Sequence, residues 1–512
     1  MVREAICGSS LKSAPTGFNV SLVLPVVEVS HRTSGRWVKK PPFALLCVSM
    51  RKAKIVCTLG PSSDSSKTIE EMIAAGMDVA RLNFSHGTHA EHRARTQKVR
   101  AAAKRTGRHV AILQDLQGPK IRLGKFEGGQ LRVNDRDVVT ITTRPVLGGR
   151  GLIPTPVRCL PRDVKPGDPV LLDDGRVRLR VLSVSGTDVK ACVEVGGLLK
   201  DKKGLNLPGA LVSVPTLTAK DRADLKFGQT IGVDYLALSF VRRPEDILAA
   251  RKLLVRPTPI IAKIEKPQAV AALASIADVS DGIMVARGDL GVEVPLETLP
   301  GIQKTMVKTA NERGGLVIVA TEMLESMVNS LRPTRAEVSD VANAILDGAD
   351  AVMLSGETAA GQHPVEAVRT MARIVSEIEK RAVPRPSVFE HTNDVSTGVA
   401  AAAVAAADRM NASVIVAYTE SGHTARLISE LRPRCRLLAL TPNEAVVNRA
   451  ALYWGAEGYK VKRLYSTDAM VQLVKALCRA KKFAPKGSPI VIVAGAPLNV
   501  PGNTNLMSIH RC

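Results

Sequence analysis

The chain has 512 residues, too many for one hydrophobic core, so two to four domains are expected. Hydrophobic residues make up 45% and charged residues 23%, as in ordinary globular proteins, and no run of 18 apolar residues suggests a membrane span. The net charge of +23 is dispersed, aromatics reach only 3% and no nucleic-acid-binding motif occurs, so we expect neither a nucleic-acid nor a membrane partner. The charge indicates either an ordinary basic surface or, as we favour, attraction of anionic substrates.

The first 49 residues carry six basic and two acidic side chains and an apolar run from Val20 to Val27. That run is too short to span a membrane, and it lacks a clear small-residue cleavage site for a signal peptide. A transit peptide is one interpretation. We favour another, in which Met50 starts the chain and residues 1–49 are a disordered extension or a mis-assigned start. An intact mass that includes these residues would contradict it.

Eight cysteines are scattered along the chain without any CxxC pair. This spacing indicates neither a zinc site nor a redox motif, and it favours free thiols in a reducing cytoplasm.

From residue 53 onward, eight short apolar strands alternate with helical patterns. One such helix runs from Thr68 to Ala75 and ends at Gly76. Eight consecutive βα units predict a TIM (β/α)8 barrel. The expected strands span residues 53–57, 79–83, 110–113, 235–239, 260–264, 282–285, 316–320 and 351–354.

The third βα unit is interrupted after Arg122 by short alternating runs at residues 138–141, 170–172, 177–184 and 189–195. Turn signals such as Asp173-Asp174-Gly175 separate these runs, so a small all-β domain is expected to be inserted over residues 123–215. The barrel would then consist of residues 50–122 and 216–385. It resumes near Thr216, where Thr218 and Asp221 form a helix N-cap pattern.

A third block follows Pro384-Arg385-Pro386. An Ala-rich helix over residues 399–407 and strands at 414–417 and 490–493 predict an open α/β domain over residues 386–512.

The segment from Pro333 to Pro364 reads PTRAEVSDVANAILDGADAVMLSGETAAGQHP and is the most informative part of the chain. Its apolar spacing predicts a helix that ends at Gly348, followed by a buried strand over residues 351–354. The Ser-Gly-Glu-Thr that comes next is expected to form an exposed tip at the carboxyl end of that strand. Ligands bind at this end of the strands in parallel α/β proteins.

Polar side chains follow most of the other barrel strands as well. Each alone has an ordinary explanation, such as a surface ion pair for Lys-x-Glu or a turn for Gly-Asp. Together they would meet at one mouth of the barrel, which favours a shared site. The residues, in strand order, are Arg81, Asn83 and Ser85; Asp115; Ser239; Lys263 and Glu265; Asp289; Thr321 and Glu322; and Ser355 with Glu357.

The residue types in this set suggest its chemistry. Glu265 and Asp289, with few histidines nearby, suit the oxygen-liking cation Mg²⁺. Arg81 and Lys263 suit a phosphoryl group, whose transfer depends on positioning and charge neutralisation. The turn Ala286-Arg287-Gly288, if it opens a helix, would offer backbone N–H groups to an anion. The pattern predicts Mg²⁺-dependent phosphoryl transfer on a small carboxylated or phosphorylated substrate.

From about Lys52 to its C-terminus the chain resembles the pyruvate kinase family. The resemblance rests on the segments AKIVCTLGPSS, VARLNFSHG, DLQGPKIR, LLDDG, KKGLNLPG, AKIEKPQ, IMVARGDLGVEVP and ATEMLESM, besides the segment from Pro333 to Pro364. It implies the reaction phosphoenolpyruvate + ADP → pyruvate + ATP. It also implies that the inserted domain is a lid that closes over the site, that the C-terminal domain is regulatory, and that the assembly is a homotetramer.

The same resemblance implies roles for individual residues. Catalysis would fall to Arg81 on the transferring phosphate, Lys263 on the phosphoryl group and enolate, and Thr321 in a water relay that protonates the enolate. The substrate would also contact Ala286, Arg287, Gly288, Asp289 and Ser355. Glu265 and Asp289 would bind Mg²⁺, and Asn83, His86, Arg122 and Lys203 would lie near the nucleotide phosphates.

The chain departs from the family at two of these positions. Asn83, Ser85, Asp115 and Leu116 match a monovalent-cation site, but Lys120 stands where potassium-dependent members carry Glu. A lysine ammonium could replace the charge of K⁺, so activity independent of K⁺ is expected. Glu322 stands where the family usually has Gln and adds a negative charge next to Thr321; the sequence does not give its effect on rate or pH optimum.

In the C-terminal block, Thr419, Ser421, Gly422, His423 and Thr424 align with the family's effector loop. Hydroxyl groups and a glycine before a helix are typical of a phosphate cradle. The resemblance implies a sugar phosphate or AMP as the effector.

Three alternatives remain open on the sequence. Another Mg²⁺-dependent barrel, such as a dikinase or lyase, would share the carboxylate pair but would not need the inserted domain. A regulatory protein with a decayed site is disfavoured, because Arg81, Lys263, Glu265, Asp289 and Thr321 are all present. A nucleic-acid-binding protein would show salt-sensitive binding to random DNA.

Overall fold

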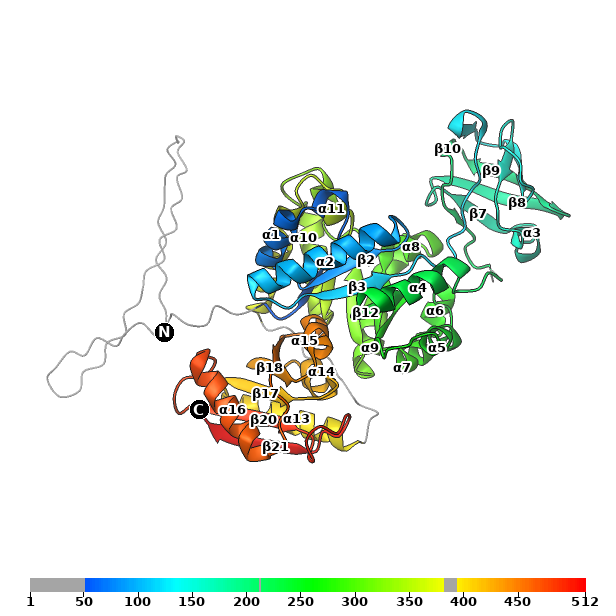
Figure 1. Ribbon diagram of the computed structural model, residues 1–512. Helices are drawn as coiled ribbons and strands as arrows, with labels where there is room; N and C mark the ends of the chain where they lie inside the picture. The colour runs from blue at the N-terminus through cyan, green and yellow to red at the C-terminus, as the bar shows by residue number, and fades with distance from the viewer. Residues whose placement is uncertain (1–50, 211–212, 382–393) are drawn as a thin grey trace, which may run out of the picture. The chain divides into compact units, whose positions relative to one another are not determined.

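A computed structural model describes residues 51–210, 213–381 and 394–512, all within one compact unit (Figure 1). The interpretation of residues 1–49 and the Pro384-Arg385-Pro386 boundary lie outside the described residues. In the parts of the chain that are described, no helix is both long and apolar enough to cross a membrane.

Eight parallel strands close into a barrel in the order β1-β16-β15-β14-β13-β12-β3-β2, which confirms the predicted fold class. Their side chains are almost wholly buried because helices cover the outside and the strands' own side chains fill the inside. The strands are β1 (Lys54–Thr58), β2 (Val79–Asn83), β3 (Ala111–Asp115), β12 (Tyr235–Leu238), β13 (Ile260–Ile264), β14 (Gly282–Ala286), β15 (Leu316–Ala320) and β16 (Ala351–Leu354).

Capping residues fix where the outer helices begin. Thr88, Thr218 and Thr334 each accept a hydrogen bond from the N–H three residues later and form capping boxes at the starts of α2, α4 and α10. The helices of the barrel are α1 (Ser66–Ala75), α2 (His89–Thr106), α4 (Ala219–Ile231), α5 (Pro244–Lys252), α6 (Pro267–Ala271), α7 (Leu273–Val279), α8 (Arg287–Glu293), α9 (Leu299–Glu312), α10 (Arg335–Leu346), α11 (Gly356–Ala359) and α12 (Pro364–Glu379).

The connection from β3 to α4 holds the inserted domain, which we call the lid, drawn in cyan to teal in Figure 1. It is all-β apart from a four-residue helix, α3 (Leu160–Asp163), and a single 3-10 turn (Glu127–Gly129), and it has a core of its own. A six-stranded sheet runs in the order β11-β7-β8-β9-β5-β6, beside the pair β10-β4. The strands are β4 (Gln130–Val133), β5 (Val138–Thr142), β6 (Leu152–Pro154), β7 (Pro169–Leu172), β8 (Val177–Ser185), β9 (Asp188–Val195), β10 (Gly197–Lys200) and β11 (Leu205–Asn206).

The C-terminal domain is an open sheet in the order β19-β18-β17-β20-β21, parallel except for its edge strand β21. The prediction of an open α/β domain is confirmed, although three of these strands were not expected. The elements are α13 (Val395–Arg409), β17 (Val414–Tyr418), α14 (His423–Glu430), β18 (Arg436–Thr441), α15 (Glu444–Arg449), β19 (Ala456–Lys460), α16 (Thr467–Ala480), β20 (Pro489–Ala494) and β21 (Leu506–Arg511).

One local expectation is wrong. The Ser-Gly-Glu-Thr after β16 is not an exposed tip, because Glu357 and Thr358 are fully buried and α11 begins there. The Glu357 carboxylate accepts hydrogen bonds from the N–H groups of Leu324 and Ser355, at 3.0 and 2.6 Å. This motif therefore ties two strand-end loops together instead of presenting its glutamate to solvent.

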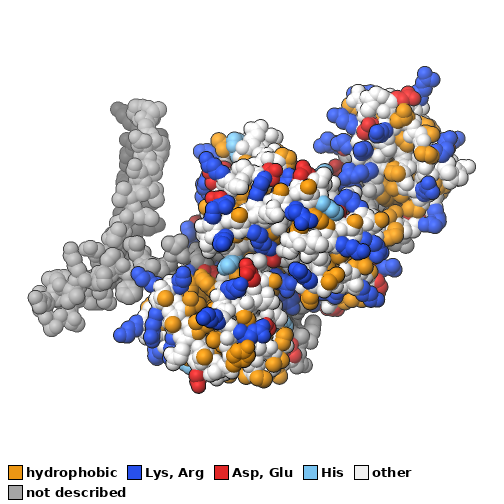
Figure 2. Space-filling view, in the orientation of Figure 1, with side chains coloured by type: hydrophobic (Ala, Val, Ile, Leu, Met, Phe, Trp, Pro, Cys, Tyr) orange, Lys and Arg blue, Asp and Glu red, His pale blue; other side chains and the backbone are white. Residues whose placement is uncertain are grey.

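The surface agrees with a dispersed positive charge. In Figure 2, Lys and Arg side chains are spread over the whole visible face of the described residues and interleaved with other residue types. The six cysteines in the described ranges are all free thiols, as expected from their spacing.

Candidate active site at the mouth of the barrel

Side chains from four neighbouring strands form one buried charge cluster at the carboxyl ends of the strands. Arg81 donates to Asp115 at 2.7 Å, and Lys263 lies 3.2 Å from the other oxygen of Asp115 and 2.8 Å from Glu265. Lys263 also donates to the Ser239 hydroxyl at 2.7 Å. The mouth cluster, defined here as Arg81, Asp115, Ser239, Lys263 and Glu265, brings together residues predicted from four separate segments.

Burial and pairing set the ionisation of the mouth cluster. Burial alone would lower the pKa of Lys263, but Asp115 and Glu265 outweigh it and hold that pKa above its usual value. Burial would raise the pKa of Asp115, yet Lys263 and Arg81 lower it. Burial raises the pKa of Glu265 against the opposing effect of Lys263. The two cations are therefore fixed and charged where an anion would arrive.

Two carboxylates offer oxygen ligands beside these cations. Glu265 is 1% exposed, and its Oε2 accepts the Phe240 N–H at 2.8 Å while Oε1 faces Lys263. Asp289, at the start of α8, is half-buried and lies 3.4 Å from the Lys120 ammonium. No group of three or more His, Cys, Asp or Glu suited to a metal occurs among the described residues. Two carboxylates suit Mg²⁺, which commonly takes its remaining ligands from water and substrate oxygens.

The loop after β15 is strained beside this cluster. Thr321 and Glu322 have φ of 70° and 54°, in the left-handed region that a β-branched residue such as threonine rarely adopts. The Thr321 hydroxyl donates to the Ala320 carbonyl and accepts the Gly288 N–H at 2.7 Å. The Gly288 amide that was expected to receive a substrate carboxylate thus has the Thr321 hydroxyl as its partner.

Arg287 holds that strained loop in place. Its guanidinium donates to the carbonyl oxygens of Ala320 and Thr321 and pairs with Asp340 at 2.6 Å. The side chain is 9% exposed. At this turn the Arg287 side chain is therefore bonded within the protein, and the Gly288 N–H is bonded to the Thr321 hydroxyl.

Other predicted residues surround the mouth without joining the cluster. Asn83 accepts the Ser85 N–H, and the Leu116 carbonyl accepts the Ser239 hydroxyl at 2.6 Å. Ser355 has a buried hydroxyl with no partner among the described residues. His86 is exposed, and partial burial together with the nearby charges of Arg122, Arg81 and Lys120 lowers its pKa.

The lid contributes the remaining predicted residues. Arg122 donates to the Lys202 carbonyl at the base of the lid, and Lys203 pairs with Asp173 of the LLDDG segment at 2.8 Å. A cleft of about 1000 Å³ lies between lid and mouth. Its walls include Asp174 and Arg178 from the lid and, from the barrel, Lys120, Gly288, Asp289, Thr321 and Ser355.

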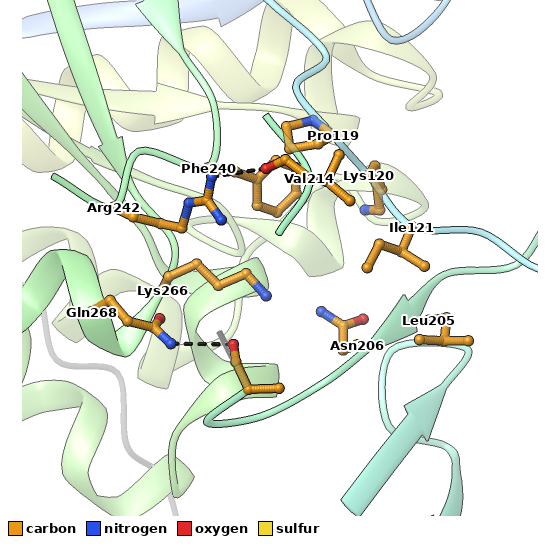
Figure 3. A pocket seen from close by; sticks show the side chains of 11 residues that line it. Pro119, Lys120, Ile121, Leu205, Asn206, Val214, Phe240, Arg242, Lys266 and Gln268 are labelled. Carbon is orange, nitrogen blue, oxygen red and sulfur yellow. Dashed lines mark hydrogen bonds between the residues drawn. The ribbon is translucent and has the colours of Figure 1, made fainter. Parts of the chain in front are cut away.

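The turn of the DLQGPK segment packs tightly against the end of β12. Gly118 has φ of 68°, and a Cβ there would lie 2.7 Å from the Phe240 ring, so only glycine fits. Beside it is a cavity of about 40 Å³, shown in Figure 3, where Lys120, Arg242 and Lys266 surround Phe240. The turn thereby places Lys120 at the edge of the mouth.

Several contacting residues were not anticipated. Thr58 accepts a hydrogen bond from Arg81 at 2.8 Å. Asn206 of the lid donates to Glu293 at 3.0 Å, and Glu293 also pairs with Lys266 at 2.6 Å. Thr58 lies within the segment TLGPSS and Asn206 within KKGLNLPG, and residue spacing within a segment does not predict its contacts with other segments.

The expected effector loop lies at the start of α14. Thr419 accepts the Gly422 N–H, and Gly422 has φ of 91°. Thr419, Ser421 and Thr424 line a cavity of about 10 Å³, whereas His423 lines a different one, of about 220 Å³. The loop therefore borders two cavities, and Ser421 takes part in both.

Comparisons with known proteins agree with this geometry. Residues 50–368 match the family model described as pyruvate kinase, barrel domain, and residues 397–510 match pyruvate kinase, alpha/beta domain. The chain is 48% identical to a pyruvate kinase of Corynebacterium glutamicum over 90% of its own length and 97% of the relative. It is 45% identical to a pyruvate kinase of Mycobacterium tuberculosis over 90% and 98%. A crystal structure of a pyruvate kinase from Cryptosporidium parvum superposes with a TM-score of 0.85 at 37% identity, covering 90% of this chain and 96% of that one.

Proposed function

Because the chain belongs to the pyruvate kinase family of phosphotransferases, we propose that it transfers the phosphoryl group of phosphoenolpyruvate to ADP and so forms pyruvate and ATP. The observation that carries this proposal is the mouth cluster. It holds two permanently charged cations, Arg81 and Lys263, less than one-tenth exposed and beside two carboxylates. Such preorganised charge is what phosphoryl transfer requires of a protein.

In the proposed reaction the bond between phosphorus and the enol oxygen breaks while a terminal oxygen of ADP bonds to phosphorus. Arg81 and Lys263 hold the phosphoryl oxygens, and Lys263 also stabilises the negative charge left on the enolate oxygen. The enolate then takes a proton at its terminal carbon. Thr321 would position a water for this step, since its own hydroxyl is too weak an acid to supply the proton directly.

Glu265 and Asp289 are the residues that would hold Mg²⁺, which would neutralise phosphoryl charge when bound. The Oε1 atom of Glu265 faces the mouth cluster beside Lys263, and the Asp289 carboxylate borders the large cleft, so both carboxylates suit an oxygen-liking cation. Ala286 and Gly288 would face the substrate carboxylate through their backbone. Asn83, His86, Arg122 and Lys203 would surround the nucleotide phosphates as the lid closes and excludes water.

We further propose that activity does not require K⁺. The Lys120 ammonium lies 3.4 Å from Asp289 at the edge of the mouth, where a fixed positive charge can act on the same anions as a bound monovalent cation. Asn83, Ser85, Asp115 and Leu116 would line that cation position. The Asn83 side-chain oxygen and the Leu116 carbonyl oxygen already accept hydrogen bonds from the protein. This is consistent with a site that does not need a bound cation.

The test is pyruvate formation from phosphoenolpyruvate and ADP with Mg²⁺, in buffers containing only Na⁺ or K⁺. We expect equal rates in both, and K⁺-stimulated activity in Lys120→Glu. Lys125→Glu makes the same charge change on an exposed lid residue and should behave as the parent. If the parent is active only with K⁺, the proposed kinase reaction stands and the proposed role of Lys120 is refuted. No activity in either buffer from folded protein would refute the kinase.

The wider physiology is part of the same proposal. We place the enzyme in the cytoplasm as a homotetramer, regulated through its C-terminal domain by a sugar phosphate or AMP. Sedimentation at micromolar concentration would test the assembly, and a mass near that of a single chain would refute it.

A further inference from the structure

The cavity of about 40 Å³ beside the DLQGPK turn lies where the lid joins the barrel, and we call it the hinge cavity. Its walls come from three parts of the chain. The segment that enters the lid contributes Lys120, and the segment that leaves the lid contributes Asn206. The barrel contributes residues that follow β12 and β13. A ligand in the hinge cavity would therefore touch both connections of the lid and the barrel at once.

Positive charge exceeds negative charge in this lining. The cavity is lined by Lys120, Arg242 and Lys266 and, among the described residues, by no Asp or Glu. The Arg242 guanidinium donates to the Val214 carbonyl at 2.8 Å and to the Thr216 hydroxyl at 3.2 Å. Both acceptors are neutral, so these bonds position the guanidinium without cancelling its charge. An anion that enters the cavity would meet a cation already held in place.

The two lysines are compensated to different degrees. Lys266 pairs with Glu293 at 2.6 Å, and its ammonium lies 5.9 Å from the centre of the Phe240 ring. Lys120 lies 3.4 Å from Asp289, whereas a close charge-assisted hydrogen bond measures about 2.7–2.9 Å. Lys120 is therefore the lysine whose ammonium can turn to another anion without breaking a short contact.

One buried polar atom of the lining has no partner. Gln268 Oε1 is buried and accepts no hydrogen bond from any residue in the described ranges, while its Nε2 donates to the Ala210 carbonyl at 3.4 Å. An unsatisfied buried acceptor is costly, and a ligand hydroxyl that donates to it would remove that cost. The cavity thus requires a donor as well as an anion.

The rest of the lining is apolar and limits the size of a ligand. Phe240, Ile121 and Leu205 provide this surface, and in Figure 3 the ends of Lys266 and Asn206 point toward one another across the space. One water needs about 10–15 Å³ of such a cavity, so the space admits about three waters. That room suits a molecule of about four carbon atoms.

We propose that the hinge cavity binds a short hydroxycarboxylate. Its carboxylate would lie on Arg242 and Lys120, its hydroxyl would donate to Gln268, and its carbon chain would pack against Phe240. The site is distinct from the mouth cluster and shares none of its residues. Binding there does not depend on the proposed catalysis.

The position of the cavity gives binding there a consequence for the lid. A ligand that contacts both connections and the barrel would hold the lid at a fixed angle. Lid movement accompanies turnover in the proposed function, so we expect bound ligand to lower kcat, and excess phosphoenolpyruvate should not restore it. This expectation rests on the proposed function, whereas binding does not. An unchanged kcat with saturating ligand would refute control of the lid.

The experiment is titration calorimetry on the full chain with 3-hydroxybutyrate, butyrate and 1,3-butanediol. We expect 3-hydroxybutyrate to bind with a Kd of about 1 mM or below, and butyrate, which lacks the hydroxyl, about 2- to 10-fold more weakly. 1,3-Butanediol lacks the carboxylate and should not bind. Arg242→Gln should weaken binding of 3-hydroxybutyrate by about 10- to 100-fold, and Arg242→Lys, which keeps the charge, by less. If Arg242→Gln fails to fold, Val214→Phe fills the cavity and should exclude the ligand.

Matched variants separate this site from other parts of the molecule. Arg243→Gln removes an exposed neighbouring arginine, and Lys263→Met alters only the mouth cluster, so both should bind as the parent does. Gln268→Met removes the buried acceptor, so 3-hydroxybutyrate should bind no better than butyrate, whose own affinity should not change. Gln362→Met, at an exposed glutamine, should keep the preference for the hydroxyl.

Three results would overturn the proposal. One is no binding of 3-hydroxybutyrate up to about 10 mM, well above the range of a specific site. Another is loss of binding in Lys263→Met but not in Arg242→Gln, which would place the ligand at the mouth. The last is an unchanged preference for the hydroxyl in Gln268→Met, which would remove Gln268 as its acceptor.

Discussion

The two ends of the barrel both contain buried charges, but they accommodate them in opposite ways. In the mouth cluster, Lys263 contacts two carboxylates, and each of the four charged side chains has a partner. At the other end lies a floor cluster of Asp350, Glu430 and Arg432, in which Arg432 pairs with Asp350 at 2.6 Å. Both carboxylate oxygens of Glu430 are buried with no hydrogen-bond partner among the described residues.

The difference lies in how many of the two carboxylates at each end have a cation in direct contact: both at the mouth, but only Asp350 at the floor. Two cations at the mouth keep Asp115 ionised. At the floor, burial and the charge of Asp350 raise the pKa of Glu430 to about 8, because Arg432 and Arg426 compensate only in part. The mouth thus preserves charge that a ligand can use, and the floor removes charge by binding a proton.

The largest expected effect is on stability at the floor. Arg432→Met removes the cation from a side chain that is 4% exposed and leaves Asp350, which is fully buried, without its partner. Breaking such a pair costs about 3–5 kcal/mol, so the free energy of unfolding should fall by that amount in urea denaturation. Arg434→Met, an exposed neighbour, should change it little. A loss no larger than that of the control would mean that the floor pair contributes little to the free energy of unfolding.

Next in size is an effect on catalysis at the mouth. Lys263→Met removes the charge placed on the phosphoryl group and enolate, and kcat should fall by about 10²–10³-fold or more. Lys252→Met, an exposed lysine at the end of α5, is the matched control. Thermal unfolding of both variants separates lost chemistry from lost structure. A folded Lys263→Met enzyme within tenfold of the parent would remove Lys263 from the mechanism.

A third prediction concerns pH at the floor. Glu430 has a folded pKa of about 8, above the ordinary value of an unfolded glutamate, so its protonated form stabilises the fold. The stabilisation is complete below about pH 4.5 and is lost as pH rises to about 8, by at most about 1.4 kcal/mol per pH unit. Glu430→Gln should flatten this decline in unfolding experiments between pH 5 and 8.

The matched control is Glu444→Gln, since Glu444 is exposed and Lys460 lowers its pKa. It should leave the pH dependence of unfolding nearly unchanged. Identical slopes for the parent and Glu430→Gln would show that Glu430 is ionised throughout and that the contrast between the two ends is incorrect.

The smallest expected effect tests whether the mouth cluster works alone or needs the lid. Asn206→Ala removes one hydrogen bond to Glu293, worth about 1.5–3 kcal/mol at most because the acceptor is charged. We expect KM for ADP to rise several-fold with kcat nearly constant. Asn134→Ala, an exposed lid residue near β4, should leave both unchanged. A fall in kcat instead would indicate that this contact shapes the chemistry.

Periodicity predicted much of the fold because buried parallel strands are nearly continuous apolar runs. Residues 79–83, 260–264 and 316–320 match the observed strands in full. The predicted strand ends also brought Arg81, Lys263 and Glu265 to one place, since parallel strands in a barrel share an end. Their distances and ionisation could not be predicted, because they depend on neighbours from other strands.

What the sequence did not indicate depends on contacts distant along the chain. Edge strand β21 is poorly buried, with Ile509 45% exposed, so its apolar pattern is weak. Glu357 was predicted to be exposed because its own segment does not reveal the hydrogen bond that its carboxylate accepts from the Leu324 N–H. The floor cluster joins Asp350 to Arg432 over a long stretch of chain, and no spacing rule connects them.

The lid enters and leaves the barrel through two adjacent chain segments. Leu205 donates to the Ile121 carbonyl at 3.0 Å, Leu123 donates to the Lys203 carbonyl at 2.8 Å, and Arg122 pairs with Gly204. Since the entrance and exit lie side by side, the barrel needs only a short turn there to remain closed. The lid could therefore be replaced by a different inserted domain, in evolution or by protein engineering, without changing the barrel strands.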